Sequence, residues 1–379
     1  MKSLDPKRSF VRHSALMAAL LSALSWFAVA ANGIIVTPAF GGQILGYDVD
    51  PTGSEGVLSE FVDQPDGSVL AATETFSQST GQIVSVVAKT ETHDDFDTVG
   101  VFGKIGLVLH QHNGQNSYLT MNPVEANNFT GMWNPPIKPS YQLGSISANQ
   151  GTARVAAYQF SFTAGNTYVF RSNIKRNTFG PQISLQPIIN VDEFLFPQIA
   201  LDTKTNQAVL ADSQGCPEPV CVMSIALVNL STGNIVEFTN NLGVGTVNGL
   251  AVDPATGIAC TTTLIDQGVE FYNLATRSGF EVQIPNAGSA LQSGLYVAFD
   301  SVHKMFLISQ YSSTGDPNNP QPRIYVYDEA GVLQETITGL QRIPVSPNSI
   351  ALNPNSRIGF VPVIVEPIHE ALELQSFSY

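Results

Sequence analysis

The chain has 379 residues, which is enough for one large domain or two average ones. Only 13% of the residues are charged and 43% are hydrophobic, and Gly and Pro are frequent, which argues against a disordered chain and a helical bundle and favours an all-β protein. The formal net charge of −14 argues against a nucleic-acid partner, because backbone phosphates must be met by Lys and Arg.

Residues 1–30 have the order of a secretory signal peptide: basic residues come first, then an apolar run over 15–29 that ends in small residues. The alternative is an uncleaved anchor, but the run is short for a membrane span of about 20 residues. We therefore expect cleavage after Ala30 or Ala31, leaving a single exported domain of residues 31–379, periplasmic or extracellular, without membrane insertion. Because the signal carries four basic residues and one acidic residue, the net charge of the mature chain becomes −17.

Residues 43–62 are typical of two strands joined by a turn, and we expect them to be the third and fourth strands of a four-stranded unit. Residues 63–196 have the length of about three further units. Strands are predicted there at 106–109, 154–162 and 168–171, and we expect a long Pro-rich loop over residues 127–141.

Two histidines, His110 and His112, stand at the end of a predicted strand, so their imidazoles would face the same side. The acidic stretch 93–97 is near in sequence and begins with a third histidine. These residues could form a metal site with nitrogen and oxygen ligands. The alternative is a solvated acidic loop beside a turn.

An internal repeat determines the predicted fold. Four segments share an apolar–Ala–apolar–Asp/Asn pattern, at spacings of 51, 47 and 53 residues, and each is followed by a polar turn and a second apolar run: Ile199–Asp202, Leu250–Asp253, Val297–Asp300 and Ile350–Asn353. In three units a second hairpin follows: 224–238, 269–284 and 323–337. Four antiparallel strands in about 50 residues make one blade of a β-propeller, so the 349 residues after the signal predict seven blades.

The ends of the chain must meet, because an open ring would expose two sheet edges. The chain finishes soon after a first and a second strand at 350–361, so we expect N-terminal strands to complete the last blade. Residues 371–377 could instead supply its third strand.

Three cysteines are present. Cys216 and Cys221 flank four residues between the second and third strands of one unit, and in an oxidising compartment they could form a disulfide, the alternative being two free thiols. Cys260 lies within an apolar run, and we expect it to be a buried free thiol.

The units at 250–257 and 224–238 resemble the repeats of YVTN-type and NHL-type secreted β-propellers, which belong to the WD40/YVTN-like group. That resemblance implies a fold that hosts binding scaffolds, lactonases and dehydrogenases alike. The stretch that starts at Asn248 resembles the "NGLA" motif of gluconolactonase-like propellers, in which the Asn helps to hold a divalent cation at the mouth of the central channel. Asn348 repeats this Asn in another unit, which favours a turn-capping role.

No complete catalytic motif is found in the sequence. We therefore expect an exported, acidic, non-enzymatic β-propeller, monomeric and without a cofactor, that binds a ligand or protein partner through loops on one face. The alternative is a metal-dependent, lactonase-like hydrolase, with Ca²⁺ or Zn²⁺ at the channel mouth and Asn248 among its ligands.

Overall fold

The computed structural model describes residues 28–30, 33–91, 97–102, 105–112, 115–121, 129–133, 142–149, 154–161, 166–173, 178–185, 198–214, 222–244, 247–263, 268–285, 294–310, 322–341, 343, 350–364 and 372–379. Within these ranges only the backbone is described for 28–30, for 89–179 apart from Val169, and for 212–223, 237–246, 263 and 294–295.

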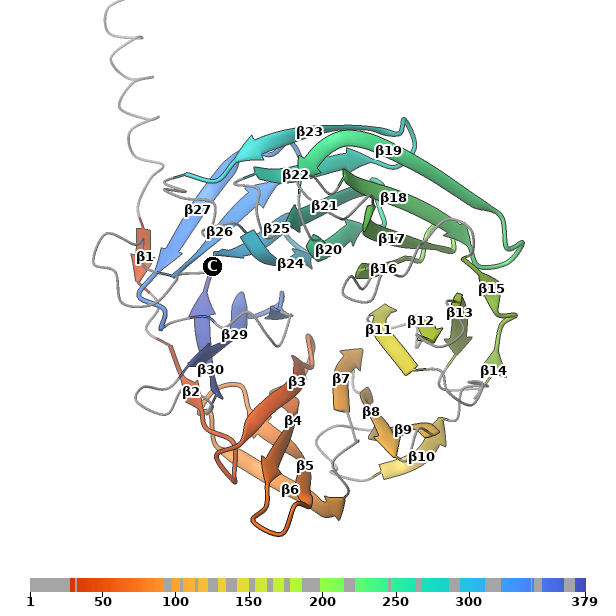
Figure 1. Cartoon of the computed structure of the whole chain (residues 1–379). Helices are drawn as coiled ribbons and strands as arrows, with labels where there is room; N and C mark the ends of the chain where they lie inside the picture. The colour runs from red at the N-terminus through yellow and green to blue at the C-terminus, as the bar shows by residue number, and fades with distance from the viewer. Residues whose placement is uncertain are drawn as a thin grey trace, which may run out of the picture.

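All elements in the described residues are β-strands, and they pair into seven sheets arranged as blades around a common centre (Figure 1). This is a β-propeller, and the number of sheets is consistent with the seven blades that the repeat spacing predicts. In the described part of the chain, no helix has the length and apolar character needed to cross a membrane.

Blades 1 to 3 come from the first half of the chain, and their strands run in sequence order from the centre outward. Blade 1 contains β3 (Gln43–Val49), β4 (Glu55–Asp63), β5 (Val69–Ser77) and β6 (Ile83–Glu91). Blade 2 contains β7 (Asp97–Phe102), β8 (Ile105–His112), β9 (Gln115–Met121) and β10 (Phe129–Trp133). Blade 3 contains β11 (Gln142–Asn149), β12 (Arg154–Ser161) and β13 (Asn166–Asn173), with β14 (Thr178–Phe179) and β15 (Ile183–Ser184) both paired to β13.

Blades 4 to 7 come from the repeat region. Blade 4 contains β16 (Gln198–Asp202), β17 (Gln207–Gln214), β18 (Val222–Asn229) and β19 (Ile235–Val244), and blade 5 contains β20 (Val247–Asp253), β21 (Ile258–Thr263), β22 (Gly268–Asn273) and β23 (Ser278–Gln283). Blade 6 contains β24 (Gly294–Asp300), β25 (Met305–Gln310), β26 (Arg323–Asp328) and β27 (Leu333–Thr338). Blade 7 contains β28 (Ala351–Asn353), β29 (Ile358–Ile364), β30 (Leu372–Ser378) and the N-terminal β2 (Ile35–Val36).

The ring is closed by the N-terminus, as predicted, but with a different strand. β2 pairs antiparallel with β30, Ile35 opposite Gln375 and Val36 opposite Leu374, so β30 is the third strand of blade 7 and β2 is its outermost. Just before it, β1 (Ala28–Ala30) pairs in parallel with β27 of blade 6.

Two sequence-based assignments were wrong. Residues 43–62 form the first and second strands of blade 1 and not the third and fourth of a shared blade, because both hairpins of a blade have the same apolar pattern and turn signals. The expected loop at 127–141 contains β10, because the bulky run at 129–133 has high strand propensity and pairs with β9.

The core lies between neighbouring blades, where each sheet packs on the next. Between blades 7 and 1, Phe76 of β5 meets Phe360 of β29 edge to face, with ring centroids 5.4 Å apart, inside a cluster of buried apolar side chains. Gly359 sits under the Phe377 ring of the neighbouring strand, where an added Cβ would collide with that ring. This continuous packing fixes the positions of the turns that carry the polar residues.

Candidate functional site

On one face of the ring, the first strands of blades 1, 4, 5, 6 and 7 are each followed by a turn that an Asp or Asn at the end of the strand caps. In blade 5, Asp253 accepts hydrogen bonds from the Ala255 N–H (2.8 Å) and the Thr256 hydroxyl (2.9 Å). Equivalent caps occupy the same position in the other described turns: Asp50, Asp202, Asp300 and Asn353. We call the face formed by the turns 50–54, 203–206, 254–257, 301–304 and 354–357 the turn face. Self-capping of this kind is the reason that Asp and Asn are favoured there.

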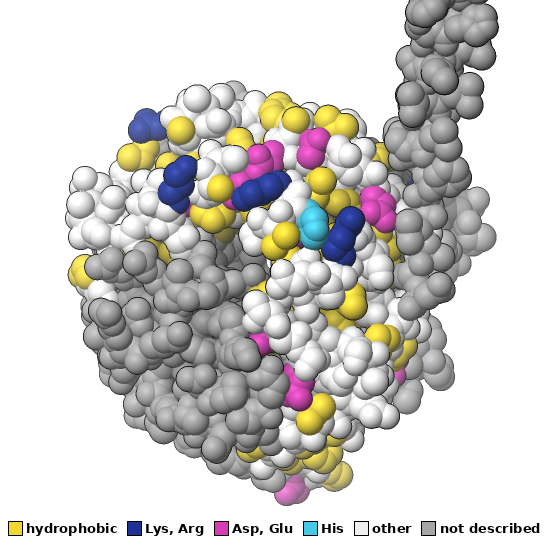
Figure 2. Space-filling model, turned by 180° about the vertical axis from the view of Figure 1, so that it is seen from behind, with side chains coloured by type: hydrophobic (Ala, Val, Ile, Leu, Met, Phe, Trp, Pro, Cys, Tyr) yellow, Lys and Arg dark blue, Asp and Glu magenta, His cyan; other side chains and the backbone are white. Residues whose placement is uncertain are grey.

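Several turns close with a left-handed residue that is not glycine. Lys304 and Arg357 have φ values of 61° and 53°, whereas the equivalent position of blade 5 holds Gly257 at 74°. A left-handed non-glycine residue costs roughly 1–2 kcal/mol. Figure 2, which views the ring from behind, shows Lys, Arg and His side chains beside Asp and Glu side chains in its upper part.

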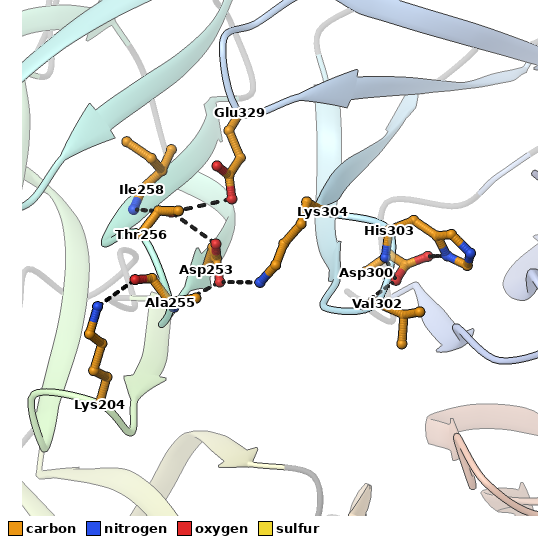
Figure 3. A network of polar contacts seen from close by, with 10 residues as sticks. All are labelled: Lys204, Asp253, Ala255, Thr256, Ile258, Asp300, Val302, His303, Lys304 and Glu329. Atoms are coloured by element: carbon orange, nitrogen blue, oxygen red, sulfur yellow. Dashed lines mark hydrogen bonds and ion pairs between the residues drawn. The ribbon is translucent and has the colours of Figure 1, made fainter.

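A connected cluster of charged and polar side chains lies at the seam between blades 5 and 6 (Figure 3). Lys304 of blade 6 reaches back to blade 5, where its Nζ lies 3.1 Å from Asp253 Oδ1. Thr256 donates to Glu329 Oε1 at 3.2 Å, so the turn of blade 5 also contacts the outer turn of blade 6. On the other side, the Lys204 Nζ of blade 4 donates to the Ala255 carbonyl at 2.5 Å. We call Asp253, Thr256, Lys304 and Glu329 the seam cluster.

The two carboxyls of the seam cluster titrate very differently. Burial opposes ionisation of Asp253, but its bonds with Glu329, the Ala255 N–H, Thr256 and Lys304 outweigh burial and lower its pKa to about 2. For Glu329, burial together with its contact with Asp253 raises the pKa to about 7. At neutral pH the pair therefore holds a charged Asp253 and a half-protonated Glu329, a split that also occurs in acid–base pairs.

A histidine on the same face is held by a buried carboxylate. His303 Nδ1 lies 2.7 Å from Asp300 Oδ2; the histidine side chain is 35% exposed and the aspartate is fully buried. The aspartate also accepts from the Val302 and His303 backbone N–H groups. This arrangement fixes the ring orientation and directs Nε2 away from the carboxylate.

Apolar side chains lie exposed near the seam cluster. Phe280 of β23 is 43% exposed and stacks on the buried Phe271, and Val332, just before β27, is 54% exposed. Gly331 packs so closely on the Phe280 ring that an added Cβ would lie 2.7 Å from it. Beside this contact is a depression of about 240 Å³, lined by β21, β22 and β23 residues that include Phe280 and Asn273.

The structure places Asn248 as the second residue of β20, at the end of the strand opposite its capping Asp253. Its Nδ2 is buried and has no hydrogen-bond partner among the described residues. In the described part of the chain no three His, Cys, Asp or Glu side chains come together as metal ligands, and Asn348 lies outside it. The metal role of Asn248 stays a prediction.

The other predicted site residues can be placed only in part. Cys216 and Cys221 lie outside the described residues, so the disulfide stays a prediction. The acidic stretch also lies outside them up to residue 96, and His110 and His112 end β8 without described side chains. Cys260 is a free, fully buried cysteine, as predicted, and burial raises the pKa of its thiol.

The sequence did not single out Lys304 or Glu329. A signal for Lys304 was present, because it stands at the turn position where the repeat of blade 5 has Gly257. Glu329 begins an ordinary polar turn, and only the packing of blades 5 and 6 brings it to Thr256.

No protein-family model and no curated protein sequence matches this chain. Solved structures do match: the WD40 repeats of RRP9 (11% identity, 93% of this chain and 99% of that chain, TM-score 0.60) and U3-55K (10%, 90% and 98%, TM-score 0.59). A chain of the mitotic checkpoint complex matches at 15% identity over 92% of this chain and 90% of its own, with a TM-score of 0.57. At these identities the likeness concerns the fold alone, and it shows that this chain folds as a WD40-like β-propeller.

Proposed function

We propose that this chain is an exported, acidic, non-enzymatic β-propeller that binds a protein partner on its turn face, over the seam between blades 5 and 6. The observation that carries the proposal is the position of exposed Phe280 and Val332 near the charged seam cluster. An aromatic anchor beside a small depression and charged groups is typical of a binding hot spot. The matched chain of the mitotic checkpoint complex is itself part of an assembly, which adds only an analogy of fold.

The finer family assignment and the cellular location belong to the same proposal. The repeats at 224–238 and 250–257 resemble those of YVTN-type and NHL-type secreted propellers, and the first thirty residues resemble a signal peptide. N-terminal sequencing of the protein recovered from the periplasm or medium should start at Ala31 or Asn32. Recovery of the intact chain from the cytoplasm would contradict export.

Site-specific photocrosslinking tests the binding surface. A photoreactive residue at position 280, in the protein expressed in its own cells, should give a discrete adduct with one partner. The matched control is position 84 on β6, where Val84 is 52% exposed on a different blade. Identical adducts at both positions, or none at 280, would remove the support for this surface.

A second candidate function, a metal-dependent lactonase-like hydrolase, is favoured by the unsatisfied side chain of Asn248. Its Oδ1 and Nδ2 exchange by a half-turn of the amide, so the buried polar end could present oxygen to a divalent cation. Metal analysis of the purified protein before and after chelation, with a lactone hydrolysis assay, tests it. The hydrolase would become the better supported function on three results together. The protein would contain stoichiometric Ca²⁺ or Zn²⁺, chelation would remove both the metal and the lactone hydrolysis, and Asn248→Ala would lack both.

A further inference from the structure

Two buried glutamates lie between blades 7 and 1. Glu60 of β4 and Glu74 of β5 are both 0% exposed, and their strands are paired so that Leu58 is opposite Glu74. Residues two apart on a strand share a side, so both glutamates face the same way as Leu58. Leu58 belongs to the apolar cluster formed with blade 7, so the two carboxyls point into the seam that closes the ring.

The two carboxyls hold the chain segment that joins β2 to β3. The Ala39 N–H donates to both oxygens of Glu74, at 3.0 and 3.1 Å. The Phe40 N–H donates to Glu60 Oε2 at 3.2 Å and the Gly42 N–H to Glu60 Oε1 at 2.6 Å. We call residues 38–42 the link.

The link matters because the closing strand is short. β2 has two residues, and beyond its pairing with β30 it is held by Ile34, which exchanges hydrogen bonds with Ser376. A strand of this length has few backbone bonds with which to resist fraying. The fastening of the link by the two glutamates therefore helps to hold the outermost strand of blade 7 in place.

No basic side chain compensates the two carboxyls among the described residues. The titratable side chain that shares their side of the blade 1 sheet is Tyr47 of β3, which lies opposite Leu58. Glu373 of β30 alternates with Leu372 and Leu374 of the apolar cluster, so it lies on the other side of blade 7, where it accepts from the Thr37 hydroxyl at 2.7 Å. Burial, the hydrogen bond with Glu60 and its charge together raise the pKa of Glu74 to about 8. Glu74 therefore keeps its proton at neutral pH and hydrogen-bonds to Glu60.

We propose that Glu60 and Glu74 form a pH-operated latch that fastens the link, and with it the closing strand β2, while the pair holds one proton. When that proton leaves, two adjacent buried carboxylates repel each other and one must move towards water. Its bonds to the link amides are then lost, and β2 loosens from blade 7.

The sign of the pH dependence follows from the direction of the shift. The folded chain binds the proton of Glu74 more tightly than the unfolded chain, whose glutamate has a pKa of 4.5. The stability contributed by the proton is complete below about pH 4.5 and falls as the pH rises towards about 8. The latch is therefore closed at acidic and neutral pH and opens in alkaline solution.

Amide hydrogen exchange of the full chain between pH 6 and 9.5 tests the latch. Expressed as protection factors, which remove the intrinsic pH dependence of exchange, protection of Ala39, Phe40 and Gly42 should fall by roughly tenfold for each pH unit above about 8. Amides of β21 and β22 in blade 5 should keep their protection over this range. In Glu74→Gln the amide can still donate to Glu60 but cannot lose a proton, so the link should stay protected.

Asp66→Asn is the matched control, because Asp66 is an exposed carboxylate of the same blade, bonded only within its own turn to Ser68. It should behave as the wild type does. An unchanged alkaline loss in Glu74→Gln would overturn the latch, and so would loss of protection in β21 and β22 at the same pH. If Glu74→Gln does not fold, the wild type alone decides, because an absence of alkaline loss of protection at Ala39, Phe40 and Gly42 overturns the proposal without any variant.

Discussion

The seam between blades 7 and 1 and the seam between blades 5 and 6 are joined at the same turns by different chemistry. At blades 5 and 6 the contact is ionic, with Lys304 donating to the capping Asp253 of the neighbouring blade. At blades 7 and 1 it is made by amides: Asn353 Nδ2 donates to Gln78 Oε1 at 2.7 Å, and Asn355 Nδ2 donates to the Pro51 carbonyl at 2.7 Å.

The difference explains why one repeat has Asn where the others have Asp. A carboxylate can only accept, so Asp253 can bond to the next blade only through a donor there, and Lys304 supplies it. Asn353 caps its own turn through Oδ1, which accepts from the Ser356 N–H, and still has an NH₂ group that can donate across the seam. Blade 1 offers acceptors there, including the carbonyls of Asp50 and Gly53.

The largest effect is expected from Asp253→Ala at the ionic seam. The substitution leaves the Ala255 N–H and Lys304 without their acceptor and removes the shorter of the two hydrogen bonds of the Thr256 hydroxyl, so the free energy of unfolding should fall by about 3 kcal/mol. Urea denaturation at pH 7 measures the change. Asp66→Asn, which keeps an acceptor in an exposed turn, should leave the free energy of unfolding nearly unchanged. A change for Asp253→Ala as small as that would show that the seam cluster does not stabilise the fold.

Asn353→Asp should cost somewhat less, about 2 kcal/mol at pH 7, and the loss should depend on pH. The new carboxylate would face Gln78 Oε1 and two carbonyls and would have no donor to offer them. The pKa of the introduced carboxyl would be raised, so the loss should shrink as the pH falls and the protonated acid regains a donor. Denaturation at pH 4 and pH 7 measures the difference; an equal loss at both would contradict this account of the seam.

Gly359→Ala tests the packing on the other side of blade 7, because Phe377 belongs to the apolar cluster that blade 7 shares with blade 6. The added methyl collides with the Phe377 ring, and the cost of overpacking should be about 1.5 kcal/mol. Gly257→Ala in blade 5 meets no atom within 4 Å, but its φ of 74° makes the backbone strained, so it should cost about 1 kcal/mol for a different reason. Adding Phe377→Leu should restore part of the stability lost in Gly359→Ala and none of that lost in Gly257→Ala.

The strands of the repeat region could be predicted because each unit contains its own turn residues at the end of its first strand. The capping residues Asp202, Asp253, Asp300 and Asn353 mark the end of a first strand, and the structure confirms every one. The closing strand had no such signal, since two residues such as Ile35 and Val36 are too few to show a period. The role of 43–62 was misassigned because one hairpin looks like another when its neighbours are unknown.

The candidate site was less accessible from the sequence. Glu60 follows Ser59, and Glu74 stands between Thr73 and Thr75. Such polar stretches are typical of strand positions in water, yet the packing of blade 7 buries both glutamates. Glu329 lies 73 residues after Thr256, and only the contact between blades 5 and 6 brings the two together. Such tertiary contacts depend on how the blades stack, which the pattern of a single repeat does not contain.

The smallest expected effect comes from Arg277→Gly and Lys304→Gly, which replace left-handed residues with φ values of 56° and 61°. Glycine removes the strain but adds freedom to the unfolded chain, so Arg277→Gly should stabilise the fold by about 0.5 kcal/mol. Lys304→Gly relieves the same strain but loses the ion pair with Asp253. Because the Lys304 side chain is 45% exposed, that ion pair contributes little, and the net effect of the substitution should lie close to zero. At 1 M NaCl the ion pair weakens, and the two variants should become equally stabilised. If Lys304→Gly already matches Arg277→Gly at low salt, the ionic contact contributes nothing to the stability of the fold, and Lys304 joins the two blades in geometry alone.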